Sequence, residues 1–166
     1  GAGQRVADLR RAVSRQKPVE LVGEALAVAG AEGRRPPDHV TCGTELLHLI
    51  PHARVGFIGL KRHEESLKAA VYHKSLPNDL GAFEIILIDP MLATGGSAVA
   101  ALDLMSERGA QRMRLVNLVA APEGIPHVHA HYPKLPIFTA AVDKRLNRKG
   151  YIVPGLGDAG DRLFGV

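Results

Sequence analysis

Apolar residues in the first third of the chain follow a helical period. They give one apolar face to a helix over residues 4–15. A second helix is predicted from Pro18 to about Ala29, because proline is favoured in the first turn of a helix. Residues 31–44 are predicted to form a loop, since Pro36-Pro37 disfavours both a helix and a central strand. A short apolar helix over residues 46–50 follows. The inward positions of the second helix would be Leu21, Val22 and Leu26.

From Arg54 onward the apolar pattern changes to short β-compatible runs separated by turns and one clear helix. The helix is predicted over Ala98–Arg108, with Val99, Leu102 and Met105 toward the sheet and Gly109 at its end. Lys61–Glu65 is charged and is expected to leave the sheet. Residues 66–72 and 74–81 could form the arms of a projecting hairpin. The predicted strands are 54–60, 85–89, 114–121 and 137–142.

Strands that alternate with helices predict an α/β fold with a parallel sheet and right-handed crossovers. Ligands of such sheets gather at the carboxyl ends of the strands, where Asp89, Pro122 and Asp143 are expected. With 166 residues, the chain is predicted to be one domain.

Composition restricts the class of partner. The formal net charge is +4 and the pI about 9.5, which suits an anionic ligand. Nucleic acid is the rival interpretation, but no recognition motif or aromatic stacking platform supports it. Cys42 is the single cysteine, which excludes an internal disulfide and favours a reducing compartment. No signal peptide or apolar run of membrane-spanning length is visible, so a cytoplasmic protein without membrane contact is expected.

The stretch Ile85–Ser97 carries the candidate chemistry. It consists of the apolar run Ile-Ile-Leu-Ile, then Asp89, then Pro-Met-Leu-Ala-Thr-Gly-Gly-Ser before the helix. A strand that passes through small residues into a helix can bind a phosphate with backbone N–H groups and the helix dipole. The stretch is neither a Walker A loop nor a dinucleotide fingerprint, since it has no lysine after the glycines and no Gly-x-Gly-x-x-Gly. From spacing alone, a tight turn capped by an aspartate remains possible.

Two segments show a family resemblance. Asp-Pro-Met-Leu-Ala-Thr-Gly-Gly-Ser, residues 89–97, resembles the phosphoribosyl pyrophosphate (PRPP) loop of uracil phosphoribosyltransferases. Tyr-Ile-Val-Pro-Gly-Leu-Gly-Asp-Ala-Gly-Asp-Arg, residues 151–162, resembles the uracil-binding segment of the same family. Residues 50–59 and 118–125 also fit, so the resemblance covers about residues 46–166. Residues 1–45 are predicted to be a helical and loop region and show no clear match.

The resemblance implies the phosphoribosyltransferase type of parallel sheet, flanked by helices, with a β-arm and a carboxyl-terminal base-binding hood. It implies transfer of the 5-phosphoribosyl group from PRPP to uracil, which gives UMP and pyrophosphate. The partners would be these two small molecules, and the arm implies a homodimer or higher homo-oligomer. Mg²⁺ would be bound mainly through the pyrophosphate of the substrate, so no protein metal site is expected.

The same resemblance assigns candidate residues. Catalytic roles fall to Asp89, Arg62 and Asp158. The uracil-binding residues would be Ile152, Gly157, Asp158 and Ala159. Without the resemblance, Arg62 could be a surface charge and residues 154–160 an ordinary glycine-rich loop. The PRPP-binding residues would be Arg62, Asp89, Pro90, Met91, Leu92, Ala93, Thr94, Gly95, Gly96, Ser97 and Asp158.

One departure from the family pattern sets the alternative function. The family has an arginine in an upstream Ile-Leu-Arg-Ala-Gly-Leu segment, and the matching residues Pro36–Gly43 contain none. A uracil- or UMP-binding regulatory homologue with impaired catalysis is therefore the second hypothesis. A phosphoribosyltransferase for another base is the third.

Two further features leave alternatives open. His127, His129 and His131 alternate, which on a strand would place all three on one face and make zinc conceivable. The resemblance gives them no role, and no cysteine or nearby carboxylate completes a ligand set. Asp143 could orient the loops of the pocket or serve only as a structural cap.

Overall fold

A computed structural model describes residues 19–26, 50, 53–62 and 69–155 of the chain. Its main sheet has seven strands, and every strand pair except β2–β3 is parallel. The path runs β3-β2-β1-β4-β6-β5, and β7 pairs with β6. The strands are β1 Val19–Leu26, β2 Arg54–Arg62, β3 Ala69–Ser75, β4 Glu84–Ile88, β5 Met91–Leu92, β6 Arg112–Ala120 and β7 Ile137–Val142.

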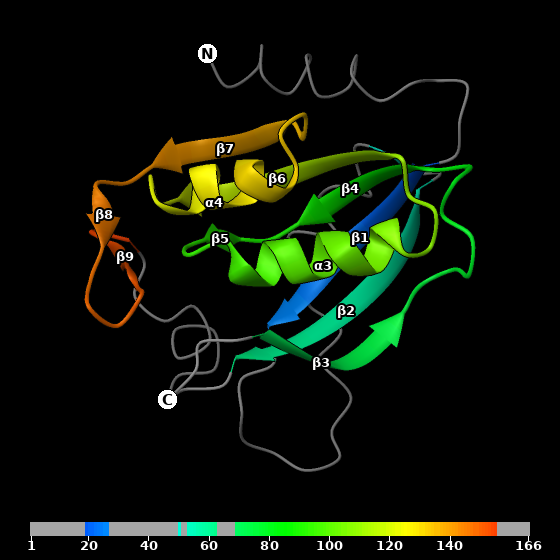
Figure 1. Ribbon diagram of the computed structural model, residues 1–166, viewed down its shortest axis with the longest axis horizontal. Coiled ribbons are helices and arrows are strands. Elements are labelled where there is room, and N and C mark those ends of the chain that lie inside the picture. The colour runs from blue at the N-terminus through cyan, green and yellow to red at the C-terminus, as the bar shows by residue number, and fades with distance from the viewer. Residues whose placement is uncertain (1–18, 27–49, 51–52, 63–68, 156–166) are drawn as a thin grey trace.

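Two helices lie on one face of this sheet (Figure 1). They are α3, Gly96–Ser106, and α4, Gly124–His131. The three residues predicted to face the sheet, Val99, Leu102 and Met105, are all buried in the core. The helix ends in a Schellman motif at Gly109, whose φ is 83°, with hydrogen bonds from Gly109 N to Ser106 O and from Ala110 N to Met105 O.

The strand β4 is the centre of the sheet. All five of its residues are buried, as expected for a strand covered on both faces. It pairs with β1 on one side and β6 on the other, so its backbone groups are satisfied in both directions. The predicted α/β class and the strands over 54–60, 85–89, 114–121 and 137–142 are confirmed, with shifts of one or two residues at several ends.

The predicted helix from Pro18 to Ala29 is wrong for the described residues, since Val19–Leu26 forms the parallel strand β1. Leu21, Val22 and Leu26 match a helical face, but Val19, Leu21 and Gly23 also match one side of a strand. Insertion between β2 and β4 gives the segment hydrogen-bonded neighbours on both edges. That tertiary pairing outweighs a weak local preference for helix.

The predicted hairpin has other bounds in the structure, and its second strand forms the antiparallel edge of the main sheet. The hairpin consists of β2 and β3, and Lys61 and Arg62 belong to β2, so the prediction that they leave the sheet is wrong. The described pairing of β1 with β2 ends at Leu26–Leu60, and within the described residues Lys61 and Arg62 pair with β3 only.

A second, two-stranded sheet follows β7. Its strands are β8, Arg145–Leu146, and β9, Ile152–Val153, which are antiparallel. Figure 1 shows this hairpin beyond the tip of β7, at the edge of the main sheet. None of the helices in the described ranges has the length and apolarity needed to cross a lipid bilayer. The predicted helices over 4–15 and 46–50, apart from Ile50, and the loop over 31–44 lie outside the described residues.

Candidate active site

The site begins where β4 breaks at Asp89-Pro90 and continues as β5. Asp89 is buried, and its Oδ1 accepts a hydrogen bond of 3.0 Å from Met91 N. Asp89 N donates to Val116 O, and the side-chain amide of Asn117 donates to Asp89 O over 2.7 Å. These bonds satisfy the backbone at the break and fix the direction of the carboxylate. Asp89 therefore sits at the carboxyl end of the central strand in a defined orientation, as the sequence predicted.

The loop from Ala93 to Gly95 turns the chain into α3. Gly95 has a φ of 83°, the left-handed region that favours glycine. A Cβ atom at Gly95 would lie 2.9 Å from Gly124 O and 3.1 Å from Val128 Cγ2. Gly95 is therefore required by the protein itself, both for its backbone conformation and for the close approach of α4.

Gly96 has a different reason to be glycine. Its φ is not in the left-handed region, and the nearest neighbour of an added Cβ would be Thr94 Oγ1, at 3.8 Å. Neither backbone conformation nor packing among the described residues demands a glycine there. Because Gly96 has no side chain, a ligand can approach the backbone closely at this position.

The first turn of α3 has the electrostatics of an anion site. No side chain caps the helix, and its first turn contains no acidic residue. The first N–H groups of a helix have no partner within the helix, which at this end concerns Gly96, Ser97 and Ala98. Gly96 N makes one long contact, 3.5 Å, to Thr94 Oγ1. Convergent N–H groups and the positive end of the helix dipole therefore face the loop together.

The first turn of α4 joins this loop to the hairpin of β8 and β9. A Cβ atom on Gly124 would lie 2.3 Å from Ala93 O, so the two backbones are in direct contact. The neighbouring Glu123 accepts a hydrogen bond of 2.9 Å at Oε1 from Leu146 N in β8. Two adjacent residues thus hold the phosphate loop on one side and the hairpin on the other.

The hairpin carries the described part of the predicted base-binding segment. Ile152 is buried, and Val153–Pro154 is a cis peptide. The next residue, Gly155, has a φ of 53°, and its N–H donates to Asp143 Oδ2 over 2.8 Å. Asp143 follows β7 directly, and its own N–H donates to Ala120 O at the end of β6. The ends of β4, β6 and β7 and the segment Ile152–Gly155 therefore share one edge of the sheet.

Comparison with known proteins decides the family. A family model described as uracil phosphoribosyltransferase matches residues 41–166 of this chain. The chain belongs to the uracil phosphoribosyltransferase family.

Curated relatives of the family extend the match. The uracil phosphoribosyltransferase of Thermoanaerobacter sp. (strain X514) is 58% identical over 121 residues, which are 73% of this chain and 58% of that protein. The chain thus spans somewhat more than half the length of that relative. The protein of the same name from Streptococcus pyogenes serotype M5 (strain Manfredo) is 48% identical over 159 residues, 96% of this chain and 74% of that protein. This second alignment extends into residues 1–45, where the sequence showed no clear match.

Solved structures agree with the fold. The AQ2163 protein of Aquifex aeolicus superposes with a TM-score of 0.75 at 35% identity, over 92% of this chain and 67% of that one. A purine phosphoribosyltransferase from Pyrococcus horikoshii Ot3 gives a TM-score of 0.60 at 14% identity, over 86% and 83% of the two chains. The second likeness shows the fold alone, an α/β fold with a largely parallel sheet.

The structure brings some of the candidate residues together and leaves others outside its described ranges. Residues 89–97 run from the end of β4 through β5 and a short loop into the first turn of α3, and Ile152 lies in the hairpin that Glu123 connects to this segment. Arg62 ends β2, and only its backbone is described. Gly157, Asp158 and Ala159, and the upstream segment Pro36–Gly43, lie outside the described residues. Their assigned roles remain predictions.

Sequence reasoning missed three residues that shape the site. Asn117 is 4% exposed and holds the backbone at Asp89, while Glu123 and Gly124 connect the loop to the hairpin. Asn117 could have been noticed, because it is the one uncharged polar residue in the strand sequence Arg-Met-Arg-Leu-Val-Asn-Leu-Val-Ala. Glu123 and Gly124 gave no such signal, since their partners are distant in sequence.

The three histidines do not share a face, which corrects the strand-based interpretation. They lie on the helix α4, where positions two apart point in different directions. Nε2 of His129 is 3.0 Å from Leu135 O, whereas His127 and His131 stack near each other at the surface. No cluster of three or more histidine, cysteine, aspartate or glutamate residues suited to a metal occurs in the described part of the chain.

Proposed function

We propose that this chain transfers the 5-phosphoribosyl group from PRPP to N1 of uracil, which yields UMP and pyrophosphate. The observation that carries the proposal is the link made by Glu123 and Gly124. It keeps the phosphate loop and the start of the base-binding segment on one edge of the sheet. A nucleoside monophosphate needs such an arrangement, because its phosphate and its base must be held at a fixed separation.

The 5′-phosphate of both PRPP and UMP would occupy the space beside Gly96. The N–H groups at the start of α3 would donate to its oxygens, and the helix dipole would favour its negative charge. The open space at Gly96, which an added Cβ would fill, supports this placement.

Asp89 would orient the ribose. Its buried carboxylate is held by Met91 N through Oδ1, and its backbone is held by Asn117, so it can accept hydrogen bonds from the sugar hydroxyls without reorganisation. A fixed anion near the sugar also stabilises the positive charge that develops at C1′ in a glycosyl transfer. Family resemblance assigns Arg62 to the pyrophosphate and Ile152, Gly157, Asp158 and Ala159 to uracil.

Magnesium would enter with PRPP as part of the substrate. The ion would be held mainly by substrate oxygens, and Asp89 is the buried carboxylate of the phosphate loop. When bound, the ion neutralises the leaving pyrophosphate. A cytoplasmic setting and a homodimer built with the β2–β3 hairpin are further parts of this proposal.

The test is formation of UMP from radiolabelled uracil and PRPP with Mg²⁺, with cytosine, hypoxanthine and orotate as competing bases. Uracil is expected to be the preferred acceptor. Asp89→Asn should reduce kcat/KM by about 100-fold, the usual scale for losing one preorganised electrostatic contact. Glu107→Gln, the same charge change at an exposed site of α3's far end, should leave it unchanged. UMP binding without turnover in the folded wild-type chain would contradict the proposal and favour a regulatory homologue.

A further inference from the structure

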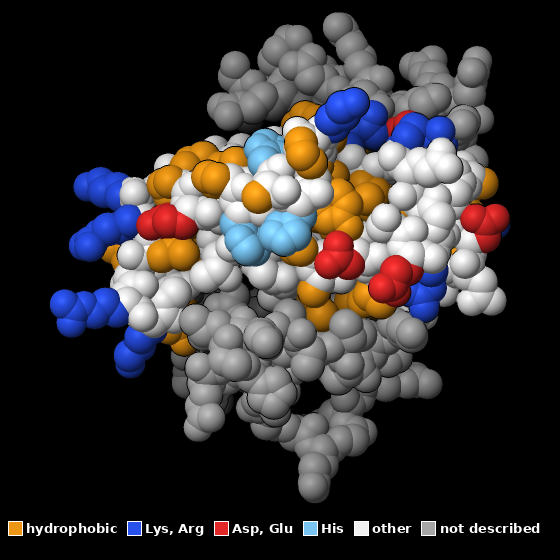
Figure 2. Space-filling model, in the orientation of Figure 1, with side chains coloured by type: hydrophobic (Ala, Val, Ile, Leu, Met, Phe, Trp, Pro, Cys, Tyr) orange, Lys and Arg blue, Asp and Glu red, His pale blue; other side chains and the backbone are white. Residues whose placement is uncertain are grey.

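The exposed face of α4 carries a pair of histidines that the proposed reaction does not use. His127 and His131 are one helical turn apart, and both are exposed. Their ring centroids are 5.0 Å apart, and the rings are inclined by 52°. Figure 2 shows histidine side chains gathered on this face of the molecule. Two imidazoles at this spacing on a helix can both reach one ion, as in metal sites built from histidines four residues apart.

The hydrogen bond of His131 determines which ring nitrogen is available. Its Nδ1 is 3.0 Å from His127 O. A carbonyl oxygen can only accept, so Nδ1 carries the proton and Nε2 of the neutral ring keeps its lone pair. Metal-binding histidines characteristically donate the other ring N–H to a backbone carbonyl or carboxylate, which fixes the ring. His131 therefore already has the supporting hydrogen bond of a metal ligand.

His127 completes the pair, and His129 does not. Within the described ranges, neither ring nitrogen of His127 has a hydrogen-bond partner. The ring of His127 packs on the phosphate loop, with Cδ2 3.2 Å from the position of a Cβ on Gly95. His129 is on another side of the helix, where its Nε2–H donates to Leu135 O. The third histidine of α4 is thus engaged in holding the end of the helix.

We propose that His127 and His131 bind one borderline divalent transition-metal ion, Zn²⁺, Ni²⁺ or Cu²⁺, as a bidentate site on the outer face of α4. Imidazole nitrogen suits these ions, and Mg²⁺ prefers oxygen, so the site is distinct from any magnesium carried by PRPP. The described residues supply two ligands and no third, so water completes the coordination and the ion exchanges readily.

The test uses the full chain without a polyhistidine tag, after removal of metals, titrated with Cu²⁺ and Ni²⁺ by calorimetry. The wild type is expected to bind one equivalent that is absent from the His127→Ala/His131→Ala double variant. Each single variant should bind at least about tenfold more weakly, and excess Mg²⁺ should not displace Ni²⁺. His129→Gln is the matched control, since its side-chain amide can still donate to Leu135 O, and it should bind like the wild type.

Electron paramagnetic resonance of the Cu²⁺ form provides a second readout. The wild type should show nitrogen hyperfine coupling from two imidazoles, and the double variant should lose it. Equal binding by the wild type and the double variant would overturn the proposal, and so would an equally large loss in His129→Gln. None of these measurements depends on phosphoribosyl transfer.

Discussion

The backbone N–H of Gly155 donates a 2.8 Å hydrogen bond to Oδ2 of Asp143, which ties the end of β7 to the segment that follows β9. Gly155 can make this bond because its φ is 53°, and a Cβ atom there would lie 2.1 Å from Ile152 O. Asp143 thus contacts the predicted base-binding segment directly. We therefore predict that Asp143 positions this segment for the base.

Asp143→Ala is expected to raise KM for uracil by about tenfold while KM for PRPP changes little. The lost bond involves a charged acceptor and corresponds to about 1.5 kcal/mol. Steady-state kinetics with each substrate varied in turn provides the measurement. Asp143→Asn keeps an acceptor oxygen and should recover most of the uracil affinity. An unchanged KM for uracil in Asp143→Ala would show that the bond does not position the base.

The two adjacent glycines of the phosphate loop should respond differently to the same substitution. Gly95→Ala should lower the free energy of unfolding by at least about 1–2 kcal/mol, because its φ is 83° and its Cβ would meet Gly124 O. Gly96→Ala should leave stability unchanged but weaken binding of UMP, since the new methyl group fills the ligand space. Urea unfolding and UMP calorimetry on both variants check this. Equal stability of the two variants would contradict the conclusion that Gly95 is required for folding and Gly96 only for ligand binding.

Asn117→Ala removes the side chain that holds the backbone at Asp89. Its side-chain amide nitrogen is 2.7 Å from Asp89 O and the residue is buried. The free energy of unfolding of the variant should therefore fall by about 1–2 kcal/mol. A several-fold fall in kcat should accompany this loss, because the direction of the Asp89 carboxylate depends on that backbone. Asn78→Ala, at an exposed position, is the control and should change neither quantity. A destabilised variant with the full wild-type kcat would show that Asn117 does not influence catalysis through Asp89.

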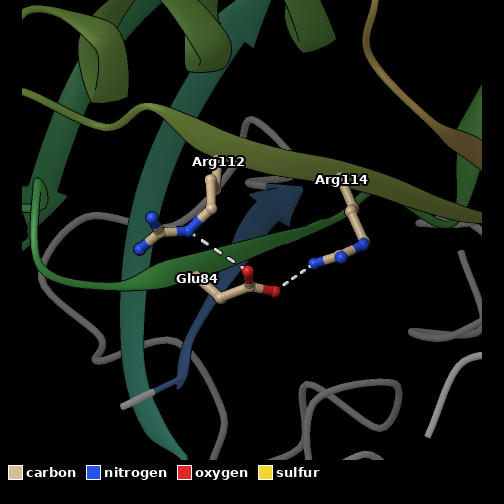
Figure 3. A network of polar contacts seen from close by, with 3 residues as sticks. All are labelled: Glu84, Arg112 and Arg114. Carbon is tan, nitrogen blue, oxygen red and sulfur yellow. Dashed lines mark hydrogen bonds and ion pairs between the residues drawn. The ribbon is translucent and has the colours of Figure 1, made fainter. Parts of the chain in front are cut away.

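Glu84 is a buried carboxylate at the start of β4, between two arginines of β6 (Figure 3). Arg112 Nε lies 3.2 Å from its Oε1, and Arg114 pairs with its Oε2. Glu84→Gln leaves both arginines without their anion and should cost about 3 kcal/mol of stability, somewhat less than for fully buried pairs because Arg112 keeps contact with solvent.

The change at Glu84 should not alter kcat of the folded protein, because it lies at the end of β4 opposite the phosphate loop. Chemical unfolding and kinetics on the folded fraction provide the measurements. Glu107→Gln, at an exposed position, should cost less than about 0.5 kcal/mol. A loss of kcat at unchanged stability would mean that this cluster influences the site.

Tyr132 donates a 2.6 Å hydrogen bond to Asp103 Oδ1, from the residue after α4 to the middle of α3. Burial raises the pKa of the Tyr132 phenol well above its ordinary value of 10.0, and the bond to Asp103 raises it further. The unfolded chain therefore loses this proton near pH 10 while the folded chain keeps it. By linkage, the contribution of Tyr132 to stability is complete below about pH 10 and is lost as the pH rises further.

Tyr132→Phe should accordingly reduce stability by about 1 kcal/mol at pH 7. The difference between wild type and variant should shrink at alkaline pH. Urea unfolding at neutral and alkaline pH measures it. A constant difference across that range would show that the phenol has an ordinary pKa in the folded protein.

The sequence predicted the central strand, the turn that follows it and α3 well, because these features are local. Ile85–Ile88 is a continuous apolar run, and residues 89–97 carry their turn chemistry in adjacent positions. The strand β1 was mistaken for a helix because Val19–Leu26 contains apolar residues that fit both periods. Only its neighbours β2 and β4, more than twenty residues away, decide the outcome.

The contacts that assemble the site could not be predicted for a related reason. Glu123 and Leu146 are 23 residues apart, and Asn117 and Asp89 are 28 apart. No pattern in a single sequence connects such pairs. Asp143 was singled out and Gly155 lay within the segment 151–162, but the bond between them depends on the turn between β8 and β9.

The peptide unit between Glu123 and Gly124 sets the distance between the loop after β5 and the hairpin of β8 and β9. One of its residues touches the loop proposed to hold phosphate and the other anchors the hairpin proposed to hold the base, so its length fixes how far apart the two halves of a nucleotide can lie. Lengthening the chain at this peptide would therefore displace the loop and the hairpin relative to each other.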